Sequence, residues 1–551
     1  DTALGIKTLP ITVTDQYGNK FSTTVDVEIT DRVKKNENDF DWDEAVVYFM
    51  MTDRFFDGNE SNNTASGTDT YGDNPGLYHG GDFAGVTAKL DYLQDLGVNT
   101  IWLTPIVENV KGVAVTEFKT MISEAHKRGM RIMVDIVVNH AGYGTESTFA
   151  DMLRDKSVSE GDIKSWQSGL PDFATENADV RAKLVEWQTS WMRNYGVDYF
   201  RVDTVKHVDS TTWAALKNST TEVNPSFKMI GEYYGAGYAS NGSTLGSGQM
   251  DADLDFDFND QATSFVSGNI SSVEKFLSAR NSALNNAYMT GQFLSSHDED
   301  GFKASLMNGK KYTEDEATSA ALVAATLQLT AKGIPVIYYG EEVGLSGLNN
   351  YPYQTNRYDM DFSKATKDNV TYQHYKNLLS IRNAYTDVFA RGSRTVVASS
   401  DEEGYDVVSR SYGGTTLYVG MNIKDTAKEV KVPVSLAAGT EVKDLYSGAT
   451  YTVGSDKTVA VTIPAAKDGG TVILAEVKKT VDSGKTDPTP EKVSATSITL
   501  DKKTAGKQQN DTKKAAPKSG DDNEVATYVC LLGLAMVAIT AATYRKKRAC
   551  N

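Results

Sequence analysis

Between Trp42 and about Ala390 the chain alternates short apolar runs with stretches of helical period, and this alternation constrains its fold most strongly. In the helical stretches apolar residues recur three and four positions apart, as Phe118, Met121 and Ile122 do. Strands that alternate with helices form a parallel sheet, and eight of them predict a closed (β/α)8 TIM barrel over residues 42–390, an α/β fold. The eight apolar runs begin at Val46, Thr100, Ile132, Tyr199, Lys228, Leu254, Met289 and Pro335.

The segments on either side of this region have a period of two, which is typical of β-strands. Residues 1–31 alternate around a turn-forming stretch and predict a short β segment, the remnant of an N-terminal β domain. Further along, Tyr405–Tyr412 and Thr415–Met421 flank Gly413–Gly414, which is the pattern of a β-hairpin. We therefore expect residues 393–477 to form a C-terminal antiparallel β-sandwich.

The last part of the chain changes composition twice. Residues 478–515 are rich in Lys, Thr, Ser, Asp and Pro, with almost no core-forming residue, and this predicts a linker. Residues 525–543 run apolar for 19 residues without a charge, long enough to span a bilayer as a transmembrane segment, and a basic cluster at 545–548 follows. Because positive charge beyond an apolar span stays in the cytoplasm, the preceding chain is expected to be extracellular.

The charge balance and the cysteines exclude two classes of protein. Lys and Arg total 56 against 73 Asp and Glu, and the net charge of −17 argues against a nucleic-acid partner. The two cysteines, Cys530 and Cys550, lie in the last 22 residues, so the preceding chain has no disulfide and no cysteine-based zinc site. The stability of the fold must then come from packing or from other ions.

Four of the expected strands end in carboxylates, and this is the main functional signal. In a TIM barrel the active site lies where the strands end, so these side chains should meet at one mouth. A single carboxylate after a strand is more often a helix cap, whereas four of them indicate a functional site. The four endings are Asp135–His140, Phe200–Asp203, Met229–Glu232 and Ser295–Asp298.

Two of these carboxylates are expected to differ in protonation. Arg201 and Asp203 are two residues apart and point to the same side of a strand, so the cation favours the ionised carboxylate. Glu232 has apolar neighbours on its strand, and desolvation would keep it protonated near neutral pH. In a glycosidase an ionised carboxylate attacks the anomeric carbon, and a protonated one gives its proton to the leaving oxygen.

Taken in this order, the four endings resemble the conserved regions of glycoside hydrolase family 13, the α-amylase family, and the resemblance spans about residues 42–477. It implies that Asp203 is the nucleophile, Glu232 the acid/base and Asp298 the group that stabilises the transition state. Asp135 is then expected to orient Arg201. The residues that would contact the sugar are His140, Arg201, Lys206, His207 and His297.

The same resemblance implies two calcium sites, which would use the oxygen ligands that Ca²⁺ prefers. The second site joins Asn139, Asp172 and the carbonyl of His207, and it holds a small B domain, at about residues 139–176, against the barrel. Leu170–Phe173 in this domain resembles a further family region. For the first site a turn rich in Asp and Asn is the alternative interpretation. The ligands of that site would be Asp57, Asn59, Asn62, Asn63, the main chain of Gly80 and Asp82.

One loop departs from the family pattern. Family members carry a Tyr-His-Gly-Tyr-Trp-like motif after the second strand, and its tyrosine stacks on the sugar in subsite −1. Here only Ile106 to Ala114 connects that strand to the next helix. Either residues are missing from this stretch between about Gly112 and Val113, or the donor subsite is more open. In the second case the enzyme would be weaker, because aromatic stacking contributes about 0.5–1.5 kcal/mol beyond burial.

Three functions remain open at this point. The first is a retaining α-amylase that cleaves internal α-1,4-glucosidic bonds of starch-like polysaccharides. The second is a neopullulanase, cyclomaltodextrinase or transglycosylase of the same family. The third is a catalytically weak surface protein that binds starch, although the presence of all three carboxylates argues against it.

The end of the chain resembles the sorting signal of Gram-positive wall-anchored proteins. At residues 516–551 an Ala-Pro-Lys-Ser-Gly stretch precedes two acidic residues, the apolar span and the basic cluster. The resemblance implies that a sortase-type transpeptidase cuts after Ser519 and joins the enzyme to the cell wall. Ala516 and Ser519 stand where the usual motif has Leu and Thr, and an ordinary C-terminal membrane anchor is the alternative.

Overall fold

A computed structural model describes most of the chain up to residue 477. The expected linker, the sorting segment with its apolar span and the loop at 107–114 all lie outside the described residues. Among the helices that are described, none is long and apolar enough to cross a bilayer. The described ranges are 5–29, 39–63, 77–106, 115–235, 237–238, 245, 249–284, 290–351 and 354–477.

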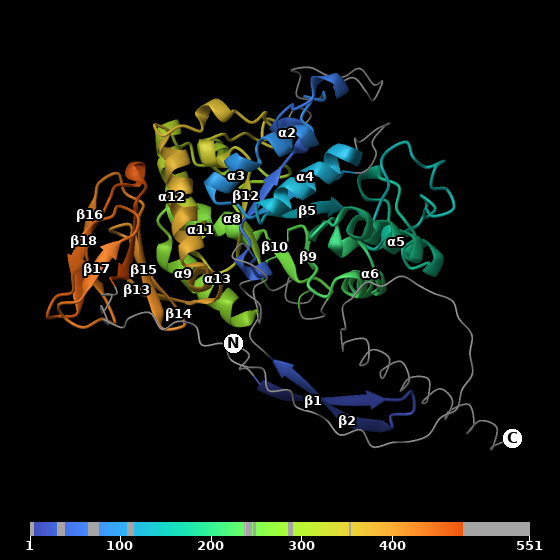
Figure 1. Cartoon of the computed structure of the whole chain (residues 1–551), viewed down its shortest axis with the longest axis horizontal. Helices are drawn as coiled ribbons and strands as arrows, with labels where there is room; N and C mark the ends of the chain where they lie inside the picture. Colours follow the sequence, from blue (N-terminus) through green and yellow to red (C-terminus); the bar gives the residue numbers. More distant parts are fainter. Residues whose placement is uncertain are drawn as a thin grey trace, which may run out of the picture. The chain divides into compact units, whose positions relative to one another are not determined.

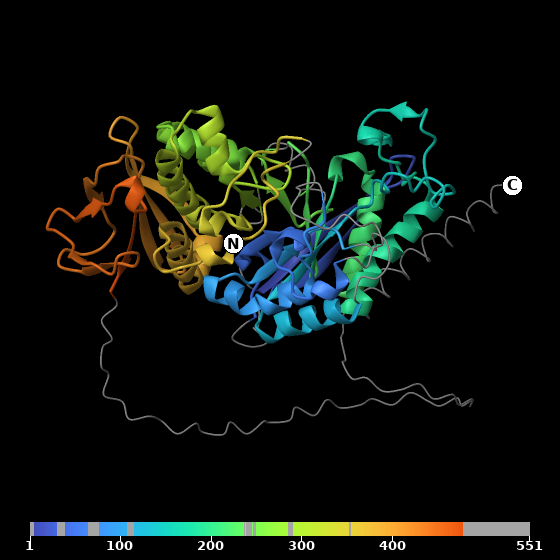
Figure 2. The same cartoon turned by 90° about the horizontal axis from the view of Figure 1, so that it is seen from above.

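Eight parallel strands close into a barrel, with β12 paired to β3 (Figures 1 and 2). The TIM barrel expected from the sequence is thereby confirmed. Seven of the expected strand starts fall within two residues of the observed ones, and the eighth, Met289, lies outside the described residues. The strands are β3 (Val47–Met50), β4 (Thr100–Leu103), β5 (Arg131–Ile136), β8 (Tyr199–Val202), β9 (Lys228–Gly231), β10 (Ala252–Asp255), β11 (Gly291–Phe293) and β12 (Ile334–Tyr338).

The barrel strands read as continuous apolar runs because helices cover their outer side. Every residue of β3, β4 and β8 is buried. In α4 the side chains of Phe118, Met121 and Ile122 are buried, as their spacing predicts. The larger helices of this region are α3 (Leu90–Leu96), α4 (Val115–Lys127), α5 (Ala178–Tyr195), α6 (Ser210–Val223), α8 (Asp257–Val266), α9 (Ile270–Ala283), α10 (Phe302–Gly309), α11 (Glu314–Thr330) and α12 (Val370–Ala384).

Between β5 and α5 the chain leaves the barrel and returns. This excursion holds the short strands β6 (Ser159–Glu160) and β7 (Lys164–Ser165). An isolated antiparallel bridge joins His140 to Asp172. The bridge brings the end of β5 against the segment that follows Leu170, so residues more than 30 positions apart come together at the barrel mouth.

After the barrel come α13 (Thr386–Arg391) and two antiparallel sheets. Val407 and Leu474 of the larger sheet share a buried cluster with Val432 and Val459 of the smaller one, which confirms the expected sandwich. The larger sheet contains β13 (Ser393–Ser400), β14 (Tyr405–Tyr412), β15 (Thr415–Asn422), β20 (Thr471–Glu476), β17 (Glu441–Asp444) and β18 (Thr450–Thr452); the smaller one contains β16 (Lys428–Pro433) and β19 (Thr458–Ile463).

Gly413 and Gly414 form the turn between β14 and β15, with φ of 55° and 78°. Two consecutive residues with positive φ are what a tight hairpin turn requires, and glycine adopts them without strain. The hairpin predicted from these two glycines is confirmed.

One buried arginine fastens the larger sheet to the barrel helices. Arg410 of β14 donates to the carbonyl oxygens of Val388, Phe389 and Gly392 at 2.8–3.1 Å, and also to that of Thr330 at the end of α11. These carbonyls lie at or near the ends of α11 and α13, where few main-chain donors remain; that of Val388 also accepts from the amide of Gly392.

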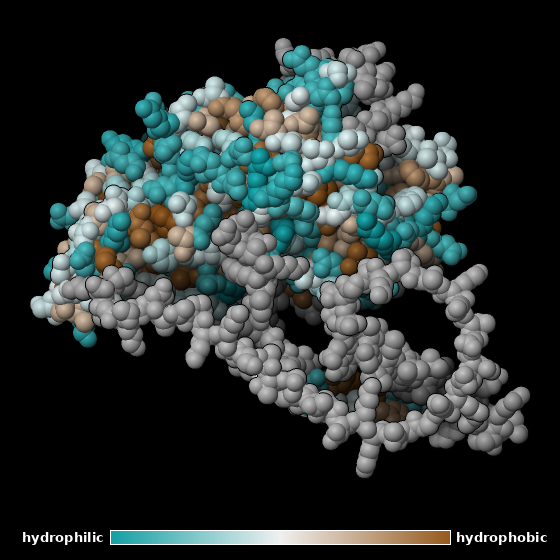
Figure 3. Space-filling view, in the orientation of Figure 1, coloured by the Kyte–Doolittle hydropathy of each residue, from teal (hydrophilic) through white to brown (hydrophobic). Residues whose placement is uncertain are grey.

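At the other end of the chain, β1 (Gly5–Thr14) and β2 (Lys20–Ile29) form a two-stranded antiparallel hairpin in which Gly5 pairs with Ile29. The short N-terminal β segment is therefore present. In Figure 3 the visible face is mostly hydrophilic, with apolar residues in scattered patches, as the large excess of acidic residues favours.

Candidate active site

Asp203 and Glu232 directly follow the neighbouring strands β8 and β9, in which Val202 pairs with Gly231. The two carboxylates therefore leave the barrel side by side. A Cβ on Gly231 would lie 2.5 Å from Asp253 Oδ1, so only glycine fits before Glu232.

The Arg201 guanidinium joins three carboxylates at the base of the site. Its Nη1 lies 2.9 Å from Asp135 Oδ1 and 2.6 Å from Asp203 Oδ1, and its Nη2 lies 2.8 Å from Glu232 Oε1. Arg201 and Asp135 are both buried. The pair Arg201 and Asp203 thus points to one side of β8, as their spacing predicts, and Asp135 contacts the guanidinium from β5.

The pKa values of Asp203 and Glu232 move in opposite directions. Burial acts to raise the pKa of Asp203, but the Arg201 charge, with its hydrogen bond, outweighs this and lowers the pKa. Burial raises the pKa of Glu232 to about 7, against the opposing charge of Arg201. At neutral pH the site therefore holds an ionised carboxylate beside one that can carry a proton.

Asp298 follows β11 on another side of the mouth. Its Oδ2 lies 3.1 Å from His297 Nε2, and its Oδ1 lies 3.0 Å from Arg357 Nη2. Burial lowers the pKa of His297 to about 4, so this imidazole is neutral at the pH values at which the protein is expected to work. Asn356 donates to the main-chain carbonyls of Ser296 and His297, each at 3.1 Å, and so fixes the loop that carries Asp298.

Aromatic residues form the floor of the site. Trp102 stacks on Phe49 with ring centroids 3.7 Å apart, and its Nε1 donates to Asp135 Oδ2 at 3.2 Å. The Arg201 guanidinium lies 5.3 Å from the Trp102 ring centroid. A cavity of about 20 Å³, room for about one water, is lined by Trp102, Arg201, Glu232, His297 and Asp298 among others.

The remaining expected sugar contacts lie around the same mouth. His140 is half-buried and close enough to Asp203 for the two charges to interact. Lys206 lies on the one-turn helix after β8, with Nζ 5.9 Å from the ring centroid of Tyr234. His207 Nδ1 lies 2.8 Å from the carbonyl oxygen of Asp162, which belongs to the excursion after β5.

The three residues expected at the second calcium site lie together. Asn139 Oδ1 lies 2.8 Å from the His207 carbonyl oxygen and 3.2 Å from Asp172 Oδ1. None of these atoms can donate to another while Asp172 is ionised, so either the amide is rotated or a cation lies between them. Arg154 Nε binds the other oxygen of Asp172 at 2.6 Å. Three converging oxygens fit Ca²⁺.

The first expected calcium site is assembled only in part. Asn63 Nδ2 donates to Asp57 Oδ2 at 2.7 Å, and Asn62 Nδ2 donates to Asp82 Oδ2 at 2.9 Å. Asn63 Oδ1 is buried and has no partner among the described residues. Both amides would have to rotate before their oxygens could face a cation together with the carboxylates.

The other two members of this loop are directed elsewhere. Asn59 Oδ1 accepts from Ser61 Oγ at 2.6 Å. The amide nitrogen of Gly80 donates to Asp53 Oδ1 at 3.2 Å, a bond that leaves its carbonyl oxygen uninvolved. Over the described ranges no three side chains of His, Cys, Asp or Glu are placed to hold a metal ion. A cation at either place would depend on amide and main-chain oxygens.

Sequence reasoning missed Trp102, Asn356 and Arg357. Trp102 lies within a strand and resembles an ordinary core residue, so its hydrogen bond to Asp135 has no local signal. Asn356 and Arg357 follow β12 in an irregular segment, and only the position of that segment after a barrel strand could have drawn attention to them.

Comparisons with known proteins point to one family. The family model described as "Alpha amylase, catalytic domain" matches residues 49–170 and 155–385. A cyclomaltodextrinase of Geobacillus thermopakistaniensis is 26% identical over 471 residues, covering 77% of this chain and 76% of the relative. A periplasmic α-amylase of Escherichia coli is 26% identical over 517 residues, covering 69% and 72%. The crystal structure of an Anoxybacillus α-amylase has a TM-score of 0.70 and 27% identity, covering 80% of this chain and all of the other.

Proposed function

Because the chain belongs to the α-amylase family of glycoside hydrolases, we propose that it is a retaining enzyme that cleaves internal α-1,4-glucosidic bonds of starch-like polysaccharides. One observation carries the proposal: Asp203 and Glu232 bind the same guanidinium, yet their pKa values shift in opposite directions. Carboxylates that share one guanidinium lie close together, which favours the spacing of about 5–5.5 Å of retaining sites.

In this mechanism the ionised Asp203 attacks the anomeric carbon while Glu232 gives its proton to the glycosidic oxygen. The bond from the anomeric carbon to that oxygen breaks, and the leaving chain departs as an alcohol. Water then attacks the glycosyl–Asp203 ester and gives a proton to Glu232, which restores both carboxyl groups. Asp298 would stabilise the positive charge that develops on the sugar.

The half-buried residues around the mouth would orient the sugar. His140 and His297 would hold the sugar beside the nucleophile, and Lys206 and His207 would contact the leaving side. Arg201 keeps Asp203 ionised, and its contact with Asp135 fixes its orientation. Nothing in this scheme requires a cofactor to take part in bond cleavage.

Calcium is part of the proposal as a structural ion. Asn139, Asp172 and the carbonyl of His207 would hold one ion, and its charge would offset the repulsion between their oxygens. The ion would tie the excursion after β5 to the end of β8. A second ion in the loop of Asp57 and Asp82 requires the two asparagine amides to rotate.

A second candidate is a cyclomaltodextrinase-like or neopullulanase-like enzyme, or a transglycosylase, of the same family. The similarity to a cyclomaltodextrinase over three quarters of both chains favours it. The chemistry at the two carboxylates would be the same, and only the size of the accepted glucan and the acceptor would differ.

A product profile on soluble starch, pullulan and cyclodextrins separates these candidates. Rapid loss of starch viscosity with slow attack on cyclodextrins supports the amylase, whereas preference for cyclodextrins or pullulan supports the second candidate. Proton NMR of the first product formed tests retention. An α anomer is expected, and a β anomer would overturn the assignment of Asp203 as nucleophile.

For the location we propose wall anchoring on the surface of a Gram-positive cell. The support is the order of features at 516–551, in which a sortase-type motif precedes an apolar span and a basic cluster. Mass spectrometry of the wall fraction should find the chain ending at Ser519. Mature surface protein that still contains Cys550 would instead indicate the C-terminal membrane anchor.

A further inference from the structure

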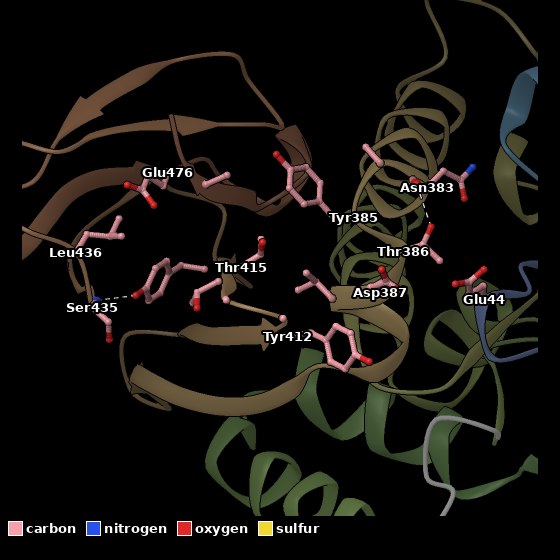
Figure 4. Close-up of a pocket in the computed structure, with 17 residues that line it drawn as sticks. Glu44, Asn383, Tyr385, Thr386, Asp387, Tyr412, Thr415, Ser435, Leu436 and Glu476 are labelled. Carbon is pink, nitrogen blue, oxygen red and sulfur yellow. Dashed lines mark hydrogen bonds between the residues drawn. The ribbon is translucent and has the colours of Figure 1, made fainter. Parts of the chain in front are cut away.

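A large cleft lies away from the carboxylates, between the end of α12 with α13 and the C-terminal sheets (Figure 4). Its volume is about 950 Å³, at the upper end of the range of small-molecule sites. Glu44, which lines it, precedes β3, so the cleft lies near the end of the barrel where the strands begin. The catalytic carboxylates lie at the opposite end.

The chemistry of the lining excludes anionic ligands. Among the lining residues there is no Lys, Arg or His, whereas Glu44, Asp387 and Glu476 supply carboxylates. Glu44 and Asp387 both pair with Arg391, whereas the side-chain carboxylate of Glu476 makes no hydrogen bond or ion pair with the described residues. A phosphate, an acidic peptide or a nucleic acid would therefore be repelled.

The same lining suits a ligand that carries many hydroxyl groups. Besides the free carboxylate of Glu476, side chains of Asn383, Thr386, Thr415 and Ser435 border the cleft from both sides (Figure 4). Asn383 Nδ2 donates to the Gly97 carbonyl and Thr386 Oγ1 to the Asn383 carbonyl, so these two side chains offer acceptors, while the hydroxyls of Thr415 and Ser435 can donate and accept. Such groups, without a net positive charge, suit a neutral sugar.

Two half-buried tyrosines supply the apolar part of the site. Tyr385 comes from the end of α12 and Tyr412 from the end of β14, and in Figure 4 they lie above and below the hairpin residues that line the cleft. Neither hydroxyl is bonded to a described residue. A tyrosine ring packs against the C–H face of a sugar while its hydroxyl remains available for a hydrogen bond.

The backbone keeps this space open. Gly413 and Gly414 form one wall, and a Cβ built on either would meet no atom within 4 Å. Their positive φ values belong to the tight turn, so the sequence that makes the hairpin also leaves the wall without side chains. The buried Tyr418 hydroxyl accepts from Ser435 N at 2.7 Å and fixes the facing loop.

We propose that this cleft is a second carbohydrate site, which binds a short α-1,4-linked glucose segment without cleaving it. The identity of the sugar rests on the proposed function, while the class of ligand, a neutral oligosaccharide, rests on the lining. A site at the opposite end of the barrel would hold a polysaccharide to the protein while another part of the chain enters the active site. The site would raise the local concentration of the polysaccharide near the active site and would take no part in bond cleavage.

Amide hydrogen exchange of the full chain with Asp203→Asn, with and without maltoheptaose, tests the proposal. At a ligand concentration ten times the dissociation constant, exchange at residues 383–388 and 412–416 is expected to slow about tenfold. Protection of these segments together with the active-site segments supports both proposals. Protection of the active site alone overturns the second site and leaves the hydrolase standing.

The remaining outcomes distinguish the second carbohydrate site from the proposed hydrolase function. Protection of the cleft alone supports the second site and contradicts the hydrolase, and protection of neither overturns both. Tyr385→Phe with Tyr412→Phe keeps the rings and should keep most of the protection, whereas Tyr385→Ala with Tyr412→Ala should abolish it in the cleft only. Tyr17→Ala, at an exposed tyrosine of the N-terminal hairpin, is the matched control and should change nothing.

Discussion

The side-chain amide of Asn139 has one atom 2.8 Å from the carbonyl oxygen of His207, so either its nitrogen donates to that carbonyl or its oxygen shares a cation with it. Asp172 contributes a third oxygen to the same place. A cation held among these three oxygens would bind the folded chain only, because in the unfolded chain these residues are far apart.

Chelation should therefore lower the thermal stability. An ion that binds only the folded state stabilises it by about 2.7 kcal/mol at a free concentration of 100 times its dissociation constant. Calorimetry with calcium and with excess chelator measures the difference. Asp172→Asn should reduce the calcium-dependent part, and Asp57→Asn tests the other loop in the same way. An unchanged melting temperature, with no metal found by elemental analysis, would remove both sites.

Asp203→Asn should abolish turnover while the fold remains intact. The amide is nearly isosteric and can still accept a hydrogen bond from Arg201, but it cannot form the glycosyl ester. We expect kcat to fall by more than about 10³-fold on starch, with circular dichroism and melting temperature close to the parent. Asp155→Asn, at an exposed aspartate of the excursion after β5, is the control. Substantial residual activity would mean that another residue is the nucleophile.

The activity should fall as the pH rises through about 7, because Glu232 must be protonated to act as the acid and its pKa is raised to about 7 by burial. Arg201, Asp203 and Asp135 face this carboxyl group and set its value. On the acid side the activity should be lost only at low pH, because the pKa of Asp203 is lowered and this carboxylate stays ionised. Glu232→Gln should lower kcat by about 10²–10⁴-fold and remove the alkaline limb. A variant that kept this limb would contradict the assignment.

Arg357 should act as a positioning residue for Asp298. Its Nη2 lies 3.0 Å from Asp298 Oδ1, and its Nε donates to the carbonyl oxygen of His297 at 3.0 Å. Arg357→Met should misplace Asp298 and lower kcat by about 10²-fold, with a smaller change in KM. Arg357→Lys should restore part of the loss through its charge. A change in KM alone would instead assign Arg357 to sugar binding.

Glu341 should make the protein less stable as the pH rises from about 4.5 to about 8. Burial raises its pKa from 4.5 to about 8, although the amide of Tyr338 and the hydroxyl of Tyr375 donate to it. Since its neutral form is favoured in the folded state, its contribution to stability is greatest below pH 4.5. That contribution is lost as the pH rises to about 8. Glu341→Gln should flatten the change in melting temperature between pH 5 and pH 8, and Glu402→Gln, at an exposed site, should not.

The sequence predicted the parts of the fold that have a local periodicity. The buried strands, the stripe of Phe118 and Met121, and the hairpin at Gly413 are all patterns of a few consecutive residues. The pairing of Arg201 with Asp203 was also predictable, because two residues on a strand share a side. The position of Asp135 beside them follows from barrel order.

The rest depends on contacts between residues far apart in the chain. Arg357 reaches Asp298 across 59 residues, and Trp102 reaches Asp135 across 33. Neither contact has a periodic signal, and each partner lies on a different element. The cleft of Tyr385 and Tyr412 could not be predicted for the same reason, since its two sides belong to a helix end and a hairpin.

Arg410 also affects whether the barrel can be separated from the C-terminal sheet. Its guanidinium lies in the C-terminal sheet, but the carbonyls that it satisfies belong to the ends of barrel helices α11 and α13. A fragment that ended after Arg391 would leave those buried oxygens without donors. We therefore expect a barrel separated from this sheet to be less stable than the intact chain, so that a gene fusion should carry the two together.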